Sequence, residues 1–292
     1  MRVTSQMVTR QFNQNIQRNN QEIYSLQQQI SSGKKYEKIS DNPLEAMKGM
    51  SHRTSLAQIE QYQKNAQDGM DRLTAVDDAL GNVTNVMQRI RELTVQASND
   101  TNHESDKQTI SIEIRALSDQ LETIANTTFN GRYLFSGMDQ ETAPMKNGVL
   151  QNVGQSAMNL DIGKGVTVNV NVSAGSVFGY QTDGRNLFET IGNLAQTLEN
   201  GQNPGDLLNV LDQQMNNVST QHTIIGTNHN LLELASNKLD QANFLNAKIL
   251  TETEGTDIAK AYMELSSHET ALQASLASGA RIMQQTLVDF LR

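Results

Sequence analysis

The sequence contains no cysteine and no tryptophan, and aromatic residues make up only 4% of it. Without cysteine, the chain can form no disulfide, no thiolate metal site and no thiol nucleophile. So few aromatic side chains favour helices with narrow apolar faces over one thick hydrophobic core. No run of about 18 apolar residues is present, so no membrane-spanning helix is expected. The first residues lack the apolar region of a secretory signal, so we expect any export to use a route without a cleaved signal.

Sequence patterns of catalysis are missing as well. No glycine-rich phosphate loop follows a strand pattern, and no serine lies in the Gly-x-Ser-x-Gly pattern of a nucleophile. His222 and His229 would share one helix face, but seven residues separate them by roughly 10 Å, too far for one metal ion. The net charge of −9 disfavours binding to nucleic acid. We therefore expect a protein that is not an enzyme and has no cofactor or metal site.

The sequence does contain long runs of apolar residues at alternating steps of three and four. Asn42 and Pro43 suit the start of the first run, and Thr101 with Glu104 fits a capping box before the second. This spacing predicts two long helices that each bury one narrow stripe against a partner helix. The predicted stripe residues are Ile59, Tyr62, Ala66, Gly69, Leu73, Val76, Leu80, Val83, Met87, Ile90, Thr94 and Ala97, then Ile110, Ile114, Leu117, Leu121 and Ile124.

Both ends of the chain carry a further heptad pattern, set off from the rest by Gly33 and Gly255. The two terminal helices could pair only with each other, or they could be surfaces for self-assembly. Polar or small residues at Asn19, Glu269, Gly279 and Thr286 favour self-assembly, because such a stripe stabilises an isolated pair poorly. The residues predicted to mediate self-assembly are Phe12, Ile16, Ile23, Leu26, Ile30, Ile258, Tyr262, Leu265, Leu272, Leu276, Met283 and Phe290.

The middle of the chain differs in composition from both ends. Val166, Val168, Val170 and Val172 alternate with polar residues, which predicts a half-buried strand, and residues 159–162 are a plausible partner strand. We therefore expect residues 138–184 to form a small β domain that is inserted between helices and dispensable for assembly. Just before this domain lie four residues that we expect to anchor the junction between the rod of long helices and this β domain, which would be the outer domain. They are Arg132, Tyr133, Leu134 and Phe135.

These patterns predict a mainly α protein with a small β insert. The N- and C-terminal regions would form an elongated antiparallel helical bundle or coiled-coil rod, with a central β-rich domain. The expected domain limits are 1–40 for the N-terminal helix, 41–137 with 185–255 for the rod, 138–184 for the outer domain and 256–292 for the C-terminal helix.

Several stretches resemble a known family. Residues 30–33 (Ile-Ser-Ser-Gly) with residues 38–43 (Lys-Ile-Ser-Asp-Asn-Pro) are similar to the break and helix start of the flagellin superfamily. The C-terminal stretch, 255–259 (Gly-Thr-Asp-Ile-Ala) to 290–292 (Phe-Leu-Arg), is similar to flagellin C-termini. Residues 126–137 (Asn-Thr-Thr-Phe-Asn-Gly-Arg-Tyr-Leu-Phe-Ser-Gly) resemble the segment typical of the hook-associated protein 3 family, the hook–filament junction proteins of the bacterial flagellum.

The resemblance implies a structural axial subunit that leaves the cell through flagellar type III export and becomes part of the extracellular flagellum. Its implied partners are hook-associated protein 1, flagellin, copies of itself, and an export chaperone at the C-terminal helix. The terminal helices would then form the inner tube, and the β insert would face outward. Two alternatives stay open: a flagellin filament subunit, and a secreted helical effector.

Overall fold

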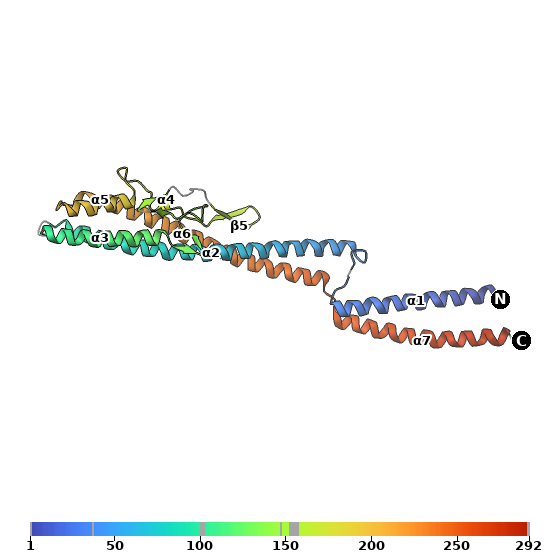
Figure 1. Ribbon diagram of the computed structural model, residues 1–292. Helices are drawn as coiled ribbons and strands as arrows, with labels where there is room; N and C mark the ends of the chain where they lie inside the picture. Colours follow the sequence, from blue (N-terminus) through green and yellow to red (C-terminus); the bar gives the residue numbers. More distant parts are fainter. Residues whose placement is uncertain (1, 37, 100–102, 147, 152–157, 291–292) are drawn as a thin grey trace. The chain divides into compact units, whose positions relative to one another are not determined.

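The structure is a computed structural model that describes residues 2–36, 38–99, 103–146, 148–151 and 158–290, with side chains for residue 7 and for residues 9–280 within these ranges. It is mainly helical, with small antiparallel strand pairs in the central region (Figure 1), which confirms the expected fold class. By packing, residues 1–58 with 243–292 form one compact unit, and residues 59–242 form the other. The domain limits expected from the sequence stay a prediction.

Four long helices build the unit of residues 59–242, and two of them continue beyond it. They are α2 (Pro43–Ala97), α3 (Glu104–Ala125), α5 (Leu187–Glu199) and α6 (Gly205–Glu254). Asn42 caps α2 as expected, since its side-chain oxygen accepts a hydrogen bond from the Glu45 amide at 3.3 Å. Every predicted stripe residue of α2 from Ala66 to Ala97 is buried, whereas Ile59 and Tyr62 are half-buried. The heptad pattern therefore identified the buried face of α2.

The helices of this unit lie antiparallel in pairs. The Ser111 hydroxyl on α3 donates to the carbonyl of Ala195 on α5 at 3.0 Å, and these two helices lie side by side in Figure 1. Across α2 and α6, Arg91 pairs with Asp212 at 2.6 Å, and Asp77 lies 2.8 Å from His222. Because a higher number on α2 meets a lower number on α6, the two helices run in opposite directions.

The start of α3 differs from its prediction. The helix begins at Glu104, and the Asp106 carboxylate accepts the hydrogen bond of the His103 amide at 3.3 Å. Asp106 therefore takes the part that the capping box assigned to Glu104, because Asp106 and not Glu104 lies three residues after the residue that precedes the helix. Thr101, the other member of the expected box, lies outside the described residues.

Three antiparallel strand pairs follow α3. They are β1 (Thr128–Phe129) with β2 (Arg132–Tyr133), β3 (Met145–Lys146) with β4 (Val149–Leu150), and β5 (Asn159–Gly163) with β6 (Val166–Asn169). The last pair confirms the predicted partner strand. However, β6 ends at Asn169 and does not reach Val172. One backbone bond continues past it, from the Val170 amide to the Met158 carbonyl at 3.1 Å. Side-chain bonds then compete with the ladder: the side chain of Asn169 accepts from the Asn171 amide at 3.0 Å, and the side chain of Asn171 accepts from the Met158 amide at 2.8 Å.

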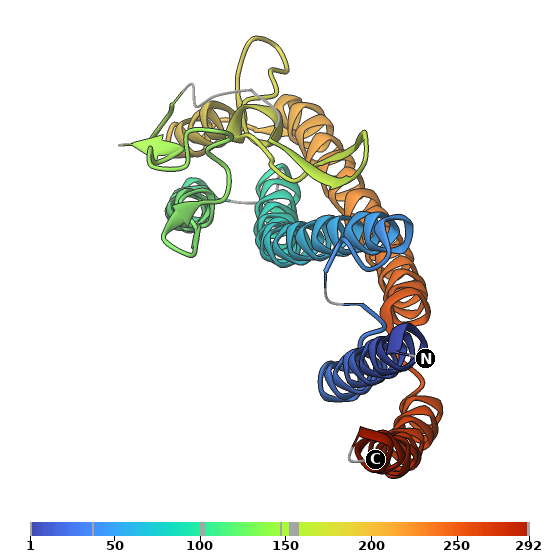
Figure 2. The ribbon, with the colours of Figure 1, turned by 90° about the vertical axis from the view of Figure 1, so that its right-hand side faces the viewer.

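The stretch of residues 138–184, expected as a β domain inserted between the helices, packs on those helices. Apolar residues of this stretch are buried in the same core as those of the long helices. They include residues of β5, of β6, and of the short helix α4 (Ala174–Val177), together with Phe178. A stretch of 47 residues with strand pairs of two to five residues per strand is too small to bury a core of its own. It therefore covers the helices as an outer layer, seen in the second view of the chain (Figure 2).

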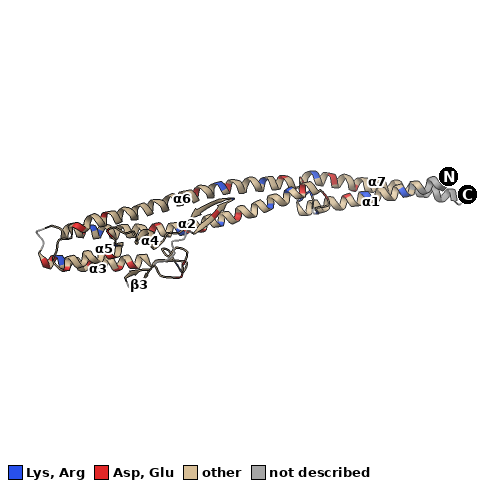
Figure 3. Cartoon of the chain, turned by 90° about the horizontal axis from the view of Figure 1, so that it is seen from above, with Lys and Arg blue, Asp and Glu red and all other residues tan. Residues whose placement is uncertain are grey.

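The other unit contains the terminal helices α1 (Arg2–Ser32) and α7 (Ile258–Phe290), with the adjoining ends of α2 and α6. The two terminal helices lie side by side and antiparallel, as Figures 1 and 2 show. In α1 most residues are uncharged (Figure 3). Among the described helices, none is both long enough and apolar enough to cross a membrane.

Candidate assembly surface

The contact between α1 and α7 uses small and polar residues. The Asn19 side-chain amide donates to the backbone carbonyl of His268 at 2.9 Å, and its oxygen lies 2.6 Å from His268 Nδ1. The Phe12 ring lies directly against Gly279, where any Cβ would overlap the ring. Leu26 and Ala261 are both more than nine-tenths buried. Among the described side chains, the pair is thus held by close approach at a few points and not by a wide apolar core.

Several large apolar side chains of α7 face away from α1. Ile258, Tyr262 and Leu276 are between 51% and 65% exposed, although the heptad pattern placed all three on one stripe with Leu265 and Leu272. The stripe that meets α1 is shifted, because residues with small or short side chains allow the two backbones to approach. Its residues are Ala261, Leu265, His268, Leu272, Ser275 and Gly279.

The remaining predicted assembly residues lie on α1 and at the C-terminal end of α7. On α1, Leu26 is buried, and Phe12, Ile16, Ile23 and Ile30 are half-buried. On α7, Met283 and Phe290 lie outside the described side chains. Met263 of α7 is also exposed, at 66%. Together with Ile258, Tyr262 and Leu276 it gives α7 several exposed apolar residues, more than the scattered single ones of an ordinary surface. Their part in self-assembly stays a prediction.

The two glycine breaks lie next to each other. Gly33 ends α1 with φ of +69°, a left-handed conformation that glycine adopts without strain. Its carbonyl accepts from the Thr256 amide at 2.9 Å, and the Lys35 amide donates to the Glu254 carbonyl at 2.7 Å. These reciprocal bonds form a short antiparallel bridge. The breaks that the sequence marked separately are therefore one structural feature.

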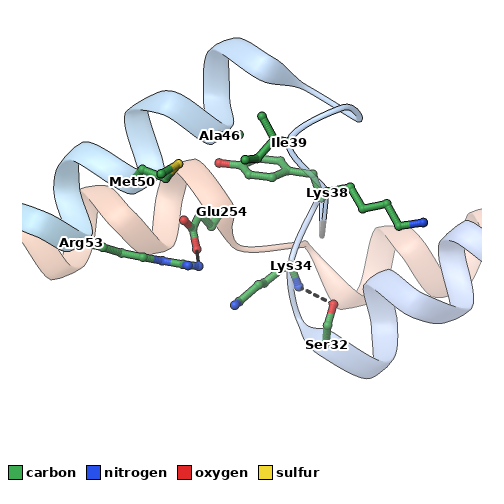
Figure 4. Close-up of a pocket in the computed structure, with 9 residues that line it drawn as sticks. Ser32, Lys34, Lys38, Ile39, Ala46, Met50, Arg53 and Glu254 are labelled. Carbon is green, nitrogen blue, oxygen red and sulfur yellow. Dashed lines mark hydrogen bonds and ion pairs between the residues drawn. The ribbon is translucent and has the colours of Figure 1, made fainter.

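A cavity of about 400 Å³ lies beside this bridge (Figure 4). Glu254 is only 8% exposed in its wall, and its carboxylate pairs with Arg53. The Tyr36 hydroxyl donates to the Glu45 carbonyl at 2.8 Å. Desolvation raises the pKa of Tyr36, and the nearby carboxylates of Glu254 and Glu45 raise it further, so the phenol keeps its proton and remains a donor. Glu254 and Tyr36 therefore both already have partners within this cavity.

The junction segment, residues 126–137, is folded against the core. β1 and β2 form a hairpin whose two turn residues, Asn130 and Gly131, have φ of 51° and 76°. Positive φ at both positions is typical of the type I′ turn that Asn-Gly favours, a signal readable from the sequence. After this hairpin, Leu134 and Phe135 are at most 1% exposed, whereas Tyr133 is half-buried and Arg132 is exposed.

Aromatic packing holds the junction segment in place. The Phe135 ring meets Phe178 edge to face at a centroid distance of 5.4 Å, and Phe178 meets Phe188 at 5.6 Å. The Phe135 carbonyl accepts from the Ala174 amide at 2.6 Å. Phe178 did not stand out in the sequence, because it lies outside every periodic run. Of the four predicted junction residues, two are therefore buried anchors, and the role of all four in joining rod and outer domain stays a prediction.

Comparison with known proteins now identifies the family. The family model of the bacterial flagellin N-terminal helical region matches residues 3–140, and that of the bacterial flagellin C-terminal helical region matches residues 208–291. The chain belongs to the flagellin superfamily. Members of this superfamily are structural proteins and not enzymes, so this chain is a structural component of the bacterial flagellum.

Individual relatives include both filament and hook-associated proteins. Flagellin of Bacillus subtilis is 27% identical over 91% of each chain. Flagellar hook-associated protein 3 of Salmonella typhimurium is 27% identical over 99% of this chain and 88% of its own. The crystal structure of Bacillus cereus FlgL superposes with a TM-score of 0.59 at 25% identity, covering 69% of this chain and 99% of the other.

Proposed function

We propose that this flagellin-superfamily subunit joins the flagellar hook to the flagellin filament. The observation that carries this proposal is the junction segment. Its sequence resembles that of the hook-associated protein 3 family, and it is an anchored element of the fold, with Leu134 and Phe135 buried in the core. The similarity to the FlgL crystal structure supports the same proposal.

In this proposal the subunit contacts hook-associated protein 1 on its hook side, flagellin on its filament side and copies of itself around the ring. The outer face of α7, with Ile258, Tyr262 and Leu276 exposed, provides apolar area for such contacts. Before assembly, an export chaperone would cover α7, and the chain would leave the cell through type III export. In the flagellum the terminal helices would form the inner tube.

A flagellin filament subunit is the second candidate. It is favoured by the similarity to Bacillus subtilis flagellin over 91% of each chain. The two candidates differ in polymerisation, since a filament subunit adds without limit, whereas a junction subunit completes one short zone.

Deletion of the gene in the flagellated source bacterium separates these candidates. For a junction subunit, we expect cells with hooks but no filaments, and flagellin released into the medium, because flagellin would have no surface on which to assemble. Re-expression of the wild-type chain should restore filaments. Hooks that still carry filaments, or a loss of flagellin itself from the medium, would contradict the junction role. Unchanged motility would favour a secreted effector.

A further inference from the structure

A second cavity, of about 420 Å³, lies within the unit of residues 59–242, between α2 and the strand pairs. Two arginines line it: Arg72 from α2 and Arg132 from β2. Part of the remaining wall is apolar, with Phe129, Leu160 and Val170. Two cations in one small cavity are a feature that neither the helical packing nor the anchoring of the junction segment requires.

Arg72 is buried with few partners. It is 8% exposed, and its Nη2 donates to the Leu134 carbonyl at 3.5 Å, at the limit of a hydrogen bond. Its Nε has no hydrogen-bond partner among the described residues. A buried guanidinium carries five donors and is stabilised only when they are paired, so an underpaired one is a sign of a missing anion.

The chain does not supply this anion from the residues described here. Among them, no carboxylate lies within ion-pair distance of Arg72 or Arg132, and the Arg132 Nη1 donates instead to the Gln140 side chain at 3.1 Å. Asp68 lines the same cavity one helical turn before Arg72, but its side chain is exposed and unpaired with either guanidinium. The sequence of residues 152–157, Asn-Val-Gly-Gln-Ser-Ala, contains no acid.

The positive charges of the two arginines also repel each other. Burial lowers the pKa of Arg72, and the positive charge of Arg132 lowers it further. Arg72 nevertheless stays protonated at neutral pH, because an arginine pKa lies far above it. A bound negative charge would offset both the burial of the Arg72 charge and its repulsion by Arg132.

We propose that this cavity binds a carboxylate between Arg72 and Arg132. Guanidinium groups match carboxylate geometry and form short charge-assisted bonds with it. The apolar wall of Phe129, Leu160 and Val170 suits the methylene groups next to such a carboxylate. The carboxylate is either an Asp or Glu side chain of a neighbouring flagellar subunit or a free organic acid. A junction subunit and a filament subunit would bind this carboxylate equally, so the test does not depend on the proposed position of the subunit between hook and filament.

NMR of the full chain, labelled with ¹⁵N-arginine, tests the site with sodium acetate as the probe. At constant ionic strength, acetate should shift the Arg72 Nε–H signal saturably, and sodium chloride should not. Arg132→Gln, at an exposed position that should not affect folding, should weaken acetate binding about tenfold, because it removes one charge-assisted partner. Arg115→Gln, at an exposed arginine outside the cavity that pairs with Glu199, is the matched control and should bind as the wild type does.

A photo-crosslinker in place of Leu160, in flagellated cells, distinguishes the two sources. A crosslink to an Asp- or Glu-containing peptide of another flagellar subunit, lost in Arg132→Gln, assigns the carboxylate to that subunit. Acetate binding without such a crosslink assigns a free acid. The proposal is overturned if acetate leaves the Arg72 signal unchanged and no crosslink depends on Arg132. It is also overturned if Arg132→Gln binds acetate as tightly as the wild type, since Arg72 would then act only as a structural bridge to Leu134.

Discussion

At the scale of single residues, neighbours in the junction segment differ sharply in burial. The sequence marked Tyr133, Leu134 and Phe135 as one apolar run, and the structure buries Leu134 and Phe135 while leaving Tyr133 half-buried. The change in burial falls where β2 (Arg132–Tyr133) ends, since Leu134 and Phe135 follow the strand and are both buried. Composition alone does not reveal which residue of such a run faces the core, because that depends on the register of the hairpin.

We predict that Phe135→Ala lowers the stability of the unit of residues 59–242 by about 3–5 kcal/mol, because it leaves a cavity beside Phe178. Tyr133→Ala, two residues away and half-buried, is the matched control and should lower it clearly less. Urea unfolding followed by circular dichroism measures both. Equal losses for the two variants would show that Phe135 is not the anchor.

At the scale of elements, the long helices and the β5–β6 pair were predictable, whereas the surface that this strand pair covers was not. The stripes of α2 and α3 follow from apolar spacing, since a helix repeats its faces every three to four residues. The valines of the β insert alternate as in any half-buried strand, and the pattern does not say which surface they cover. Val168, Val170 and Val172 cover the helices.

The register of α7 was predicted less well for a related reason. Its sequence permits two overlapping stripes that share Leu265 and Leu272. The apolar spacing favoured the one with Ile258, Tyr262 and Leu276, whereas α1 packs on the one with Ala261 and Gly279. Heptad spacing measures apolar content, and close helix contact depends also on small side chains. The exposed stripe is then free for a further partner.

We predict that Val168→Ala lowers stability by about 2 kcal/mol, since it removes two methyl groups from a site that is 3% exposed. Val166→Ala, in the same strand but 51% exposed, should change it by about 0.5 kcal/mol or less. Thermal unfolding compares the pair. If both changes are small, residues 159–169 contribute little to the core.

At the scale of the whole molecule, the terminal helices differ from the rest of the chain in how much they bury. Among the described side chains of α1 and α7, Leu26 is the one large apolar group that is more than nine-tenths buried. A helix pair with so little apolar burial gains little against the entropy of ordering its backbone. Contacts with neighbouring subunits would supply what the pair lacks.

We therefore predict that residues 1–40 and 256–292 are mobile in the dilute monomer and become ordered on assembly. Trypsin should cleave first at Arg10, Arg18 and Arg281 and leave a stable core near residues 41–255. Hydrogen exchange should show fast amides in α1 and α7 and slow ones along the buried stripe of α2. Protection of the terminal amides comparable to that of Leu80 would show that the pair is stable by itself.

The position of the subunit in the flagellum is the central claim, and immunogold electron microscopy tests it most directly. An epitope inserted next to Lys164, in the exposed turn between β5 and β6, would mark the subunit without disturbing the buried core. On intact flagella from cells that remain motile with the tagged chain, we expect label confined to one zone where the hook meets the filament. Label along the whole filament would contradict the junction role and identify a filament subunit.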